Sequence, residues 1–183
     1  MTSFRILISL LFLGAIVSFP LGATDYERPP ISYASAQTQD IIAPLIEKIR
    51  AGKFVLAHDN KHGYLEALLK ELKIPRSSQV LVFSKTSLQR QRISPKTPRA
   101  IYFNDDVTVG FCLRGDVLEV AAADPNLGTV FYTLDQDETH GVRFTRQTES
   151  CLICHGSSSN QGFPGHLIRS VSADRTGELV LSR

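Results

Sequence analysis

The sequence is poor in sulfur-containing residues and in net charge, and each shortage narrows what the protein can be. Its 183 residues include one methionine, Met1, and three cysteines. Lysine and arginine total 20 and aspartate and glutamate total 18, so the formal net charge is +2. A balance this close to neutral gives no reason to expect a nucleic-acid partner. The 43% hydrophobic content is typical of a soluble globular chain.

The N-terminus carries an apolar run that is typical of an export signal. Residues 6–17 are mostly apolar, follow Arg5 and precede a proline and several small residues. The run is shorter than the roughly 20 apolar residues that a membrane-spanning helix needs. We therefore predict a signal peptide over residues 1–23, cleaved after Ala23, and one exported, periplasmic domain over residues 24–183. Membrane association is expected only if the N-terminal segment stays uncleaved.

Residues 151–155 read Cys-Leu-Ile-Cys-His, the pattern of a covalently attached c-type haem. The two vinyl groups of haem lie on one edge of the porphyrin, so two thiols must lie about one helical turn apart on one face. Cys151 and Cys154, at i and i+3, meet this requirement. His155 follows directly and can turn its imidazole onto the iron. We predict one haem c, bound through thioethers of Cys151 and Cys154, with His155 as an axial iron ligand.

Two other sites use a Cys-x-x-Cys pair. A structural zinc site takes four Cys or His ligands, and the sequence has no second Cys-x-x-Cys pair to complete one. A thioredoxin-like dithiol lies in a βαβ unit, and no such pattern precedes Ser150. The third cysteine, Cys112, lies in an apolar-rich run where a free cysteine usually behaves as a small buried hydrophobe.

The sixth iron ligand is harder to assign. Met1 is lost with the signal peptide, which excludes His/Met ligation from within the mature chain. His166 follows a Gly-rich loop that can fold over the haem edge, so it is our candidate for a distal ligand. A five-coordinate iron and a ligand from outside the chain are the alternatives. The remaining candidates are His58, His62 and His140.

The hydrophobic pattern predicts an α+β fold with two N-terminal helices, a central antiparallel β-meander and a C-terminal haem-binding helix-loop segment. The helices are expected over residues 40–50 and 65–72, with Pro44 tolerable only near the first turn. The C-terminal helix is expected to be capped by Ser150. The predicted strands lie at residues 53–57, 80–83 (buried), 100–103, 107–113, 117–122, 129–134 and 142–145, followed by a hairpin of residues 166–171 and 178–181.

The segment from Lys73 to Arg99 carries charge of one sign. It contains seven basic residues, and no acidic residue occurs between Glu71 and Asp105. One interpretation is a docking surface for an acidic redox partner, and another is a set of arginines that neutralise the haem propionates. A solvated loop is the simplest alternative.

Several stretches resemble a family of exported bacterial cytochrome c domain proteins. They are residues 81–89, 93–95, 99–106 and 128–134, and the run 151–155 followed by Gly162 and by residues 164–166. The resemblance covers about residues 30–182. It implies covalent haem and a role in respiratory or periplasmic electron flow. Members of that family continue beyond the point where this chain ends, so a fragment or a shortened member is expected.

Two classes of function follow from these observations. An electron carrier needs a six-coordinate, partly exposed haem and a surface that a redox partner recognises. A haem enzyme, for instance of peroxidase type, needs an open iron position and an acid-base group above it. We expect the electron carrier, with the enzyme as the alternative.

Overall fold

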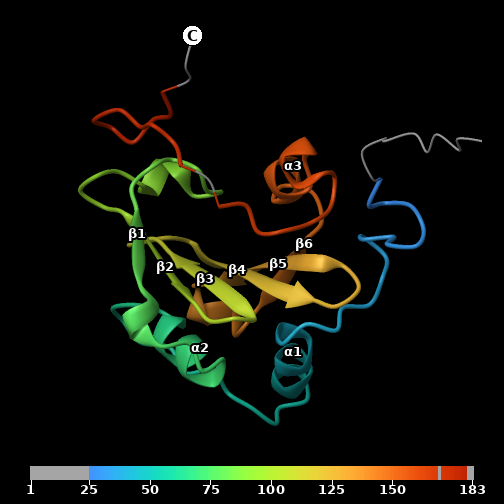
Figure 1. The fold of residues 1–183 in the computed structure, drawn as a ribbon. Helices are drawn as coiled ribbons and strands as arrows, with labels where there is room; N and C mark the ends of the chain where they lie inside the picture. The colour runs from blue at the N-terminus through green and yellow to red at the C-terminus, as the bar shows by residue number, and fades with distance from the viewer. Residues whose placement is uncertain (1–24, 169, 181–183) are drawn as a thin grey trace, which may run out of the picture.

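The structure, a computed structural model, describes residues 25–168 and 170–180, and the predicted signal peptide lies outside them. Its largest element is one six-stranded antiparallel sheet in which every strand pairs with its neighbour in sequence, in the order β1-β2-β3-β4-β5-β6 (Figure 1). The strands are β1 (Val80–Val82), β2 (Arg99–Phe103), β3 (Val107–Phe111), β4 (Val117–Asp124), β5 (Gly128–Asp135) and β6 (Phe144–Gln147).

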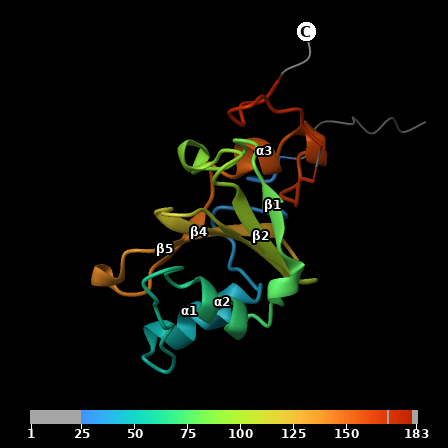
Figure 2. The same ribbon diagram turned by 90° about the vertical axis from the view of Figure 1, so that its left-hand side faces the viewer.

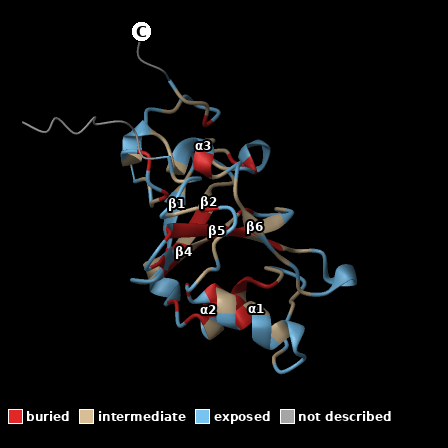
Figure 3. Ribbon diagram, turned by 90° about the vertical axis from the view of Figure 1, so that its right-hand side faces the viewer, coloured by how far each residue is buried: buried red, intermediate tan, exposed pale blue. Residues whose placement is uncertain are grey.

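The three α-helices lie on opposite sides of this sheet. Helices α1 (Ile42–Arg50) and α2 (Leu65–Glu71) cover one face, and α3 (Leu152–His155) lies over the other (Figures 1 and 2). Buried residues concentrate in the central strands and on the sides of α1 and α2 that face them (Figure 3). Short 3-10 helices complete the chain: η1 (Arg76–Ser78), η2 (Arg90–Arg92), η3 (Glu138–His140) and η4 (Ser158–Asn160). No helix within the described ranges is long and apolar enough to cross a membrane.

Helix α1 forms where the sequence predicts it. Ile42 and Leu45 are buried, and Pro44 is the third helical residue, where a missing N–H removes no intrahelical bond. The start is held by Asp40, whose Oδ1 accepts from the backbone N–H groups of Ile42 at 2.7 Å and Ala43 at 3.1 Å. The other oxygen of this buried carboxylate accepts from the Tyr132 hydroxyl on β5 at 2.7 Å, so one side chain ties α1 to the sheet.

The strand register decides which side chains face α3. The ring of Phe131 on β5 packs on His155 of α3, with ring centroids 4.7 Å apart. Phe131 pairs with Ala121, and Ala121 pairs with Thr108 on β3. Because side chains alternate along a strand, Thr108 faces α3 while Phe111, three residues on, faces α1 and α2. These two faces are called the α3 face and the α1/α2 face below.

The expected α+β fold class is wrong. The chain forms a β-rich fold with few short helices, and the C-terminal segment is not a haem-binding helix but a single turn of four residues. The six strands of the sheet outweigh the three α-helices, which have only nine, seven and four residues. The predicted antiparallel meander itself is present, with β1 and β6 added at its two edges.

Other local expectations also fail. Residues 53–57 form no strand. The segment 80–83 is an edge strand rather than a buried one, with Leu81 57% exposed. Ser150 makes no capping bond, since the residue before α3 is Cys151 and no side chain caps the helix. The C-terminal hairpin reduces to one isolated bridge between Ala173 and Leu179 in its described part.

Candidate haem-attachment site

The Cys-x-x-Cys-His residues form one turn of helix. His155 N–H donates to the Cys151 carbonyl at 3.0 Å, and Gly156 N–H donates to the Leu152 carbonyl at 2.8 Å. Leu152 is 2% exposed and anchors the turn in the core, while Cys151 is half-buried and Cys154 is exposed. Both thiols therefore project from one helical turn, as two thioether bonds to one edge of a porphyrin require.

His155 is held by a hydrogen bond that sets its tautomer. Its Nδ1 lies 2.9 Å from the carbonyl oxygen of Gly165, which can only accept, so Nδ1 carries the proton. The lone pair of the neutral imidazole then lies on Nε2, the nitrogen that binds a metal when Nδ1–H bonds to a carbonyl. The ring is further positioned by Phe131, which packs on it at an interplanar angle of 46°.

A short loop after the turn supplies this carbonyl. We call residues 156–165 the ligand loop. The side-chain amide of Asn160 donates to the carbonyl oxygens of His155 at 2.8 Å and Gly165 at 3.0 Å. Gly165 N–H also donates back to the His155 carbonyl at 3.0 Å. The loop is thus fastened to the residue that it orients.

The ligand loop is also attached to the sheet. The N–H of Thr129, at the start of β5, donates to the carbonyl of Pro164 at 3.0 Å. Gly128 precedes it with φ +78°, and a Cβ at this position would collide with the same carbonyl oxygen. A glycine is therefore needed here both for its backbone conformation and for the close approach of the loop.

Two features of the structure concern the zinc and dithiol alternatives. Among the described residues, no group of three or more His, Cys, Asp or Glu side chains lies together so as to hold a metal ion. A four-ligand zinc site is therefore not formed by them, whereas haem iron needs only an axial ligand because the porphyrin supplies the rest. The all-antiparallel sheet contains no βαβ unit of the thioredoxin type.

Burial, together with smaller contributions from the nearby Glu119 carboxylate and from Cys154, raises the pKa of the Cys151 thiol to about 11. A reactive dithiol requires the opposite shift, toward the thiolate.

An ion pair lies on the α3 face of the sheet. Arg99 Nη1 donates to Glu119 Oε2 at 2.7 Å, and the two side chains are only 16% and 18% exposed. The arginine stem passes over Gly110, whose missing side chain leaves room for it. Arg99 Nε is buried with no hydrogen-bond partner in the described part of the chain. A buried guanidinium with a spare donor is a group that an anionic substituent can bind.

The other histidines lie in different places. His166 follows the ligand loop directly, and its pKa is lowered by desolvation and by the neighbouring His155, although part of its surface is exposed. His58 Nε2 contacts the Gln136 carbonyl at 3.2 Å, and His62 packs on Phe111 with ring centroids 5.9 Å apart. His140, in η3, bonds to Asp137. The structure brings only His166 near His155.

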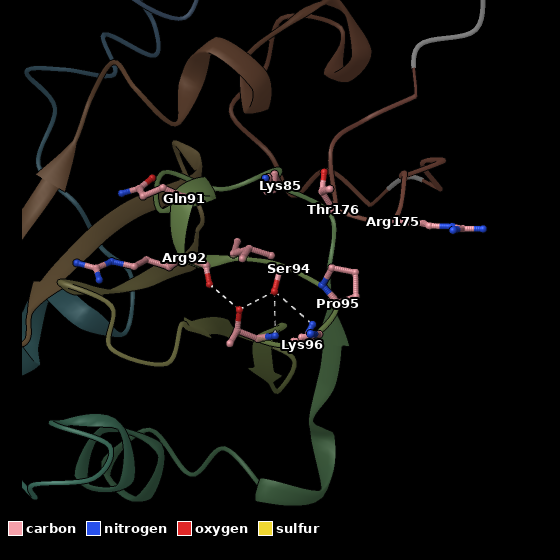
Figure 4. Close-up of a pocket in the computed structure, with 10 residues that line it drawn as sticks. Lys85, Gln91, Arg92, Ser94, Pro95, Lys96, Arg175 and Thr176 are labelled. Atoms are coloured by element: carbon pink, nitrogen blue, oxygen red, sulfur yellow. Dashed lines mark hydrogen bonds between the residues drawn. The ribbon is translucent and has the colours of Figure 1, made fainter.

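Most of the basic side chains between Lys73 and Arg99 have acidic partners from other segments. Arg76 pairs with Glu66, Arg92 with Asp116, Arg99 with Glu119, and both Lys85 and Arg90 with Glu178. An open pocket of about 430 Å³ lies between this segment and the turn at Arg175 and Thr176 (Figure 4). Its lining includes Lys85, Arg92, Lys96 and Arg175. Lys85 and Arg92 are neutralised by Glu178 and Asp116, so the positive charge of this cationic pocket comes from Lys96 and Arg175, for which the described ranges show no ion pair.

Sequence reasoning missed three contributors to the site: Asn160, the Gly165 carbonyl and Phe131. A backbone carbonyl leaves no mark in the sequence. Phe131 was predicted to lie in a strand, but the sequence did not show which face of the sheet its side chain occupies. Asn160 stood in a polar loop with no spacing to mark it. No family model, curated protein or solved structure matches the chain, so the resemblance to exported cytochromes stays a prediction.

Proposed function

We propose that this protein is an exported c-type cytochrome that binds one haem covalently and carries electrons. Cys151 and Cys154 form the two thioethers, and His155 is the axial iron ligand. When bound, the haem supplies a one-electron iron couple. The chain itself would hold the group through Cys151 and Cys154 and orient the ligand His155.

The observation that supports this proposal most is the hydrogen bond from His155 Nδ1 to the Gly165 carbonyl at 2.9 Å. A histidine that only filled space would have no need of a loop built to fix its tautomer. Here the Gly165 carbonyl and the Phe131 ring contact the imidazole, and Asn160 donates to that same carbonyl. Partners of this kind orient a metal-bound histidine and raise its basicity.

Each cysteine contributes a thiol that adds across a vinyl group, so the S–H hydrogen passes to carbon and no oxidant is needed. Both thiols must be reduced beforehand, and both are free in this structure. The raised pKa of Cys151 keeps that thiol protonated near neutral pH. Arg99, with its spare Nε donor, is the residue we assign to a haem propionate.

Attachment is tested by expressing the chain with a cytochrome c maturation system and recording the pyridine haemochrome spectrum. We expect one haem that resists extraction into acidified organic solvent. Cys154→Ala should leave at most one thioether, and Cys112→Ala, the matched control, should leave attachment intact. Haem that extracts freely from the unmutated protein, or zinc bound in stoichiometric amount, would overturn the proposal.

We also propose that an acidic redox partner docks at the cationic pocket. Lys96 and Arg175 are exposed at its rim, so their charges act on an approaching anion. Replacing both by glutamate should slow oxidation of the reduced protein by the anion ferricyanide. Oxidation by cationic tris(phenanthroline)cobalt(III) should not slow. Equal effects on both oxidants would show that the pocket is remote from the electron-transfer surface.

A further inference from the structure

We propose that a haem held by His155 would keep the sixth position of its iron open to a small exogenous ligand, because the bonds of the ligand loop hold the start of His166 on the Nδ1 side of the His155 imidazole. This inference rests on the proposed haem function. It replaces the expectation of a six-coordinate, bis-histidine iron with a binding site for small monodentate ligands, which is the open position that the haem-enzyme alternative requires.

The argument starts from the imidazole of His155. Its two nitrogens lie on different edges of the ring, and the metal binds at Nε2 when the proton is on Nδ1. Whatever bonds to Nδ1 therefore lies behind the ring, away from the iron. The group that bonds there is the Gly165 carbonyl, at 2.9 Å. The end of the ligand loop thus lies on the Nδ1 side of the imidazole, away from the nitrogen that would bind iron.

His166 begins one peptide bond after that carbonyl. To reach the opposite face of the porphyrin, its side chain would have to pass both the imidazole of His155 and the ring edge. The backbone is not free to carry it there, because Gly165 N–H bonds to His155 and the Pro164 carbonyl bonds to Thr129. Asn160 fastens the same stretch by two further bonds. Moving His166 across would break this whole set.

The strand register removes His58 and His62. His62 packs on Phe111, whose side chain lies on the α1/α2 face of the sheet. His155 packs on Phe131, which faces the α3 face. The sheet therefore separates His62 from the site. His58 lies on the same side as His62, because its ring packs on Tyr64, the residue just before α2, with ring centroids 4.8 Å apart.

His140 is too far along the sheet. It follows Asp135, the last residue of β5, and bonds to Asp137 in the turn beyond. Asp135 is four residues from Phe131, or about 14 Å along the strand at about 3.4 Å per residue. The only methionine, Met1, lies outside the described residues and within the predicted signal peptide. No histidine in the described ranges is thus placed to reach the far face of a haem held by His155.

The test uses the haem-loaded protein, with attachment first confirmed by the pyridine haemochrome spectrum. Absence of covalent haem would overturn the proposed function and this inference together. With haem attached, the ferric absorption and resonance Raman spectra report the spin state, and carbon monoxide probes the ferrous iron. We expect high-spin ferric iron and complete carbon monoxide binding on mixing. Both should be unchanged, within about twofold in rate, in His166→Ala and in the remote control His140→Ala.

Two outcomes contradict the inference while leaving the proposed function standing. A low-spin protein that becomes high-spin only in His166→Ala would show that His166 is the sixth ligand. A low-spin protein that stays low-spin in every histidine variant would show that another donor fills the position. A second variant tests the proximal side directly. Asn160→Ala should shift the iron–histidine stretching band of the ferrous protein, because it removes two bonds that hold the ligand loop, whereas His166→Ala should not.

Discussion

Gly128 is the position where a single added methyl group should disturb the site from a distance. Its φ of +78° is unfavourable for any residue with a Cβ, and that Cβ would meet the Pro164 carbonyl. A left-handed conformation costs an L-residue about 1–2 kcal/mol. Forcing the ligand loop away would also break the hydrogen bond from the Thr129 N–H to the Pro164 carbonyl, which would lower the free energy of unfolding by about 0.5–1.5 kcal/mol more. We therefore expect Gly128→Ala to lower the free energy of unfolding by about 1.5–3.5 kcal/mol.

A matched control separates the two contributions. Gly52, just past α1, also has positive φ, +67°, but nothing lies within 4 Å of a Cβ built there. Gly52→Ala should therefore cost only the backbone penalty of about 1–2 kcal/mol. Urea unfolding followed by circular dichroism gives both values if the slope with denaturant is unchanged. In the haem-loaded protein, Gly128→Ala alone should shift the iron–histidine stretching band. Equal losses of stability and an unmoved band would refute the contact between the ligand loop and β5.

Three further predictions concern burial. Leu152→Ala should destabilise the protein by about 2–5 kcal/mol in urea unfolding, since Leu152 is 2% exposed; Ile153→Ala, at a side chain 78% exposed, is its control and should change stability by less than about 0.5 kcal/mol. Leu81→Lys should also leave the free energy of unfolding nearly unchanged. Its control, Leu118→Ala, at a fully buried residue on β4, should lower that free energy by about 2–5 kcal/mol. A large loss of stability in Leu81→Lys would show that β1 is a buried strand after all. Burial raises the pKa of the Cys112 thiol from 9.0 to about 11, so the folded state holds this proton to higher pH than the unfolded state. The free energy of unfolding should therefore fall as the pH rises from 9 through 11. Cys112→Ala should remove that part of the decline, and the same pH dependence in the variant would contradict the raised pKa of Cys112.

Local pattern was enough to find most of the elements. Helices α1 and α2 form where apolar residues recur at helical spacing, and the central strands lie between turn residues that end them. Pattern failed where burial depends on distant neighbours. Leu81 has the composition of a core strand, but β1 pairs only with β2 and leaves its other edge open. The fold class was misjudged because helical spacing shows where a helix forms but not how little of the chain the helices will occupy.

The sequence by itself was enough to predict the haem-attachment residues, because Cys151, Cys154 and His155 lie within five consecutive positions and their spacing suits a porphyrin whatever the fold. The tertiary structure alone decided how His155 is oriented and which histidines can approach it. The Gly165 carbonyl reaches Nδ1 from ten residues away only because the ligand loop folds back and attaches to β5. The side of the sheet on which His62 lies depends on the register of paired strands, since a shift of one residue would move every side chain to the other face.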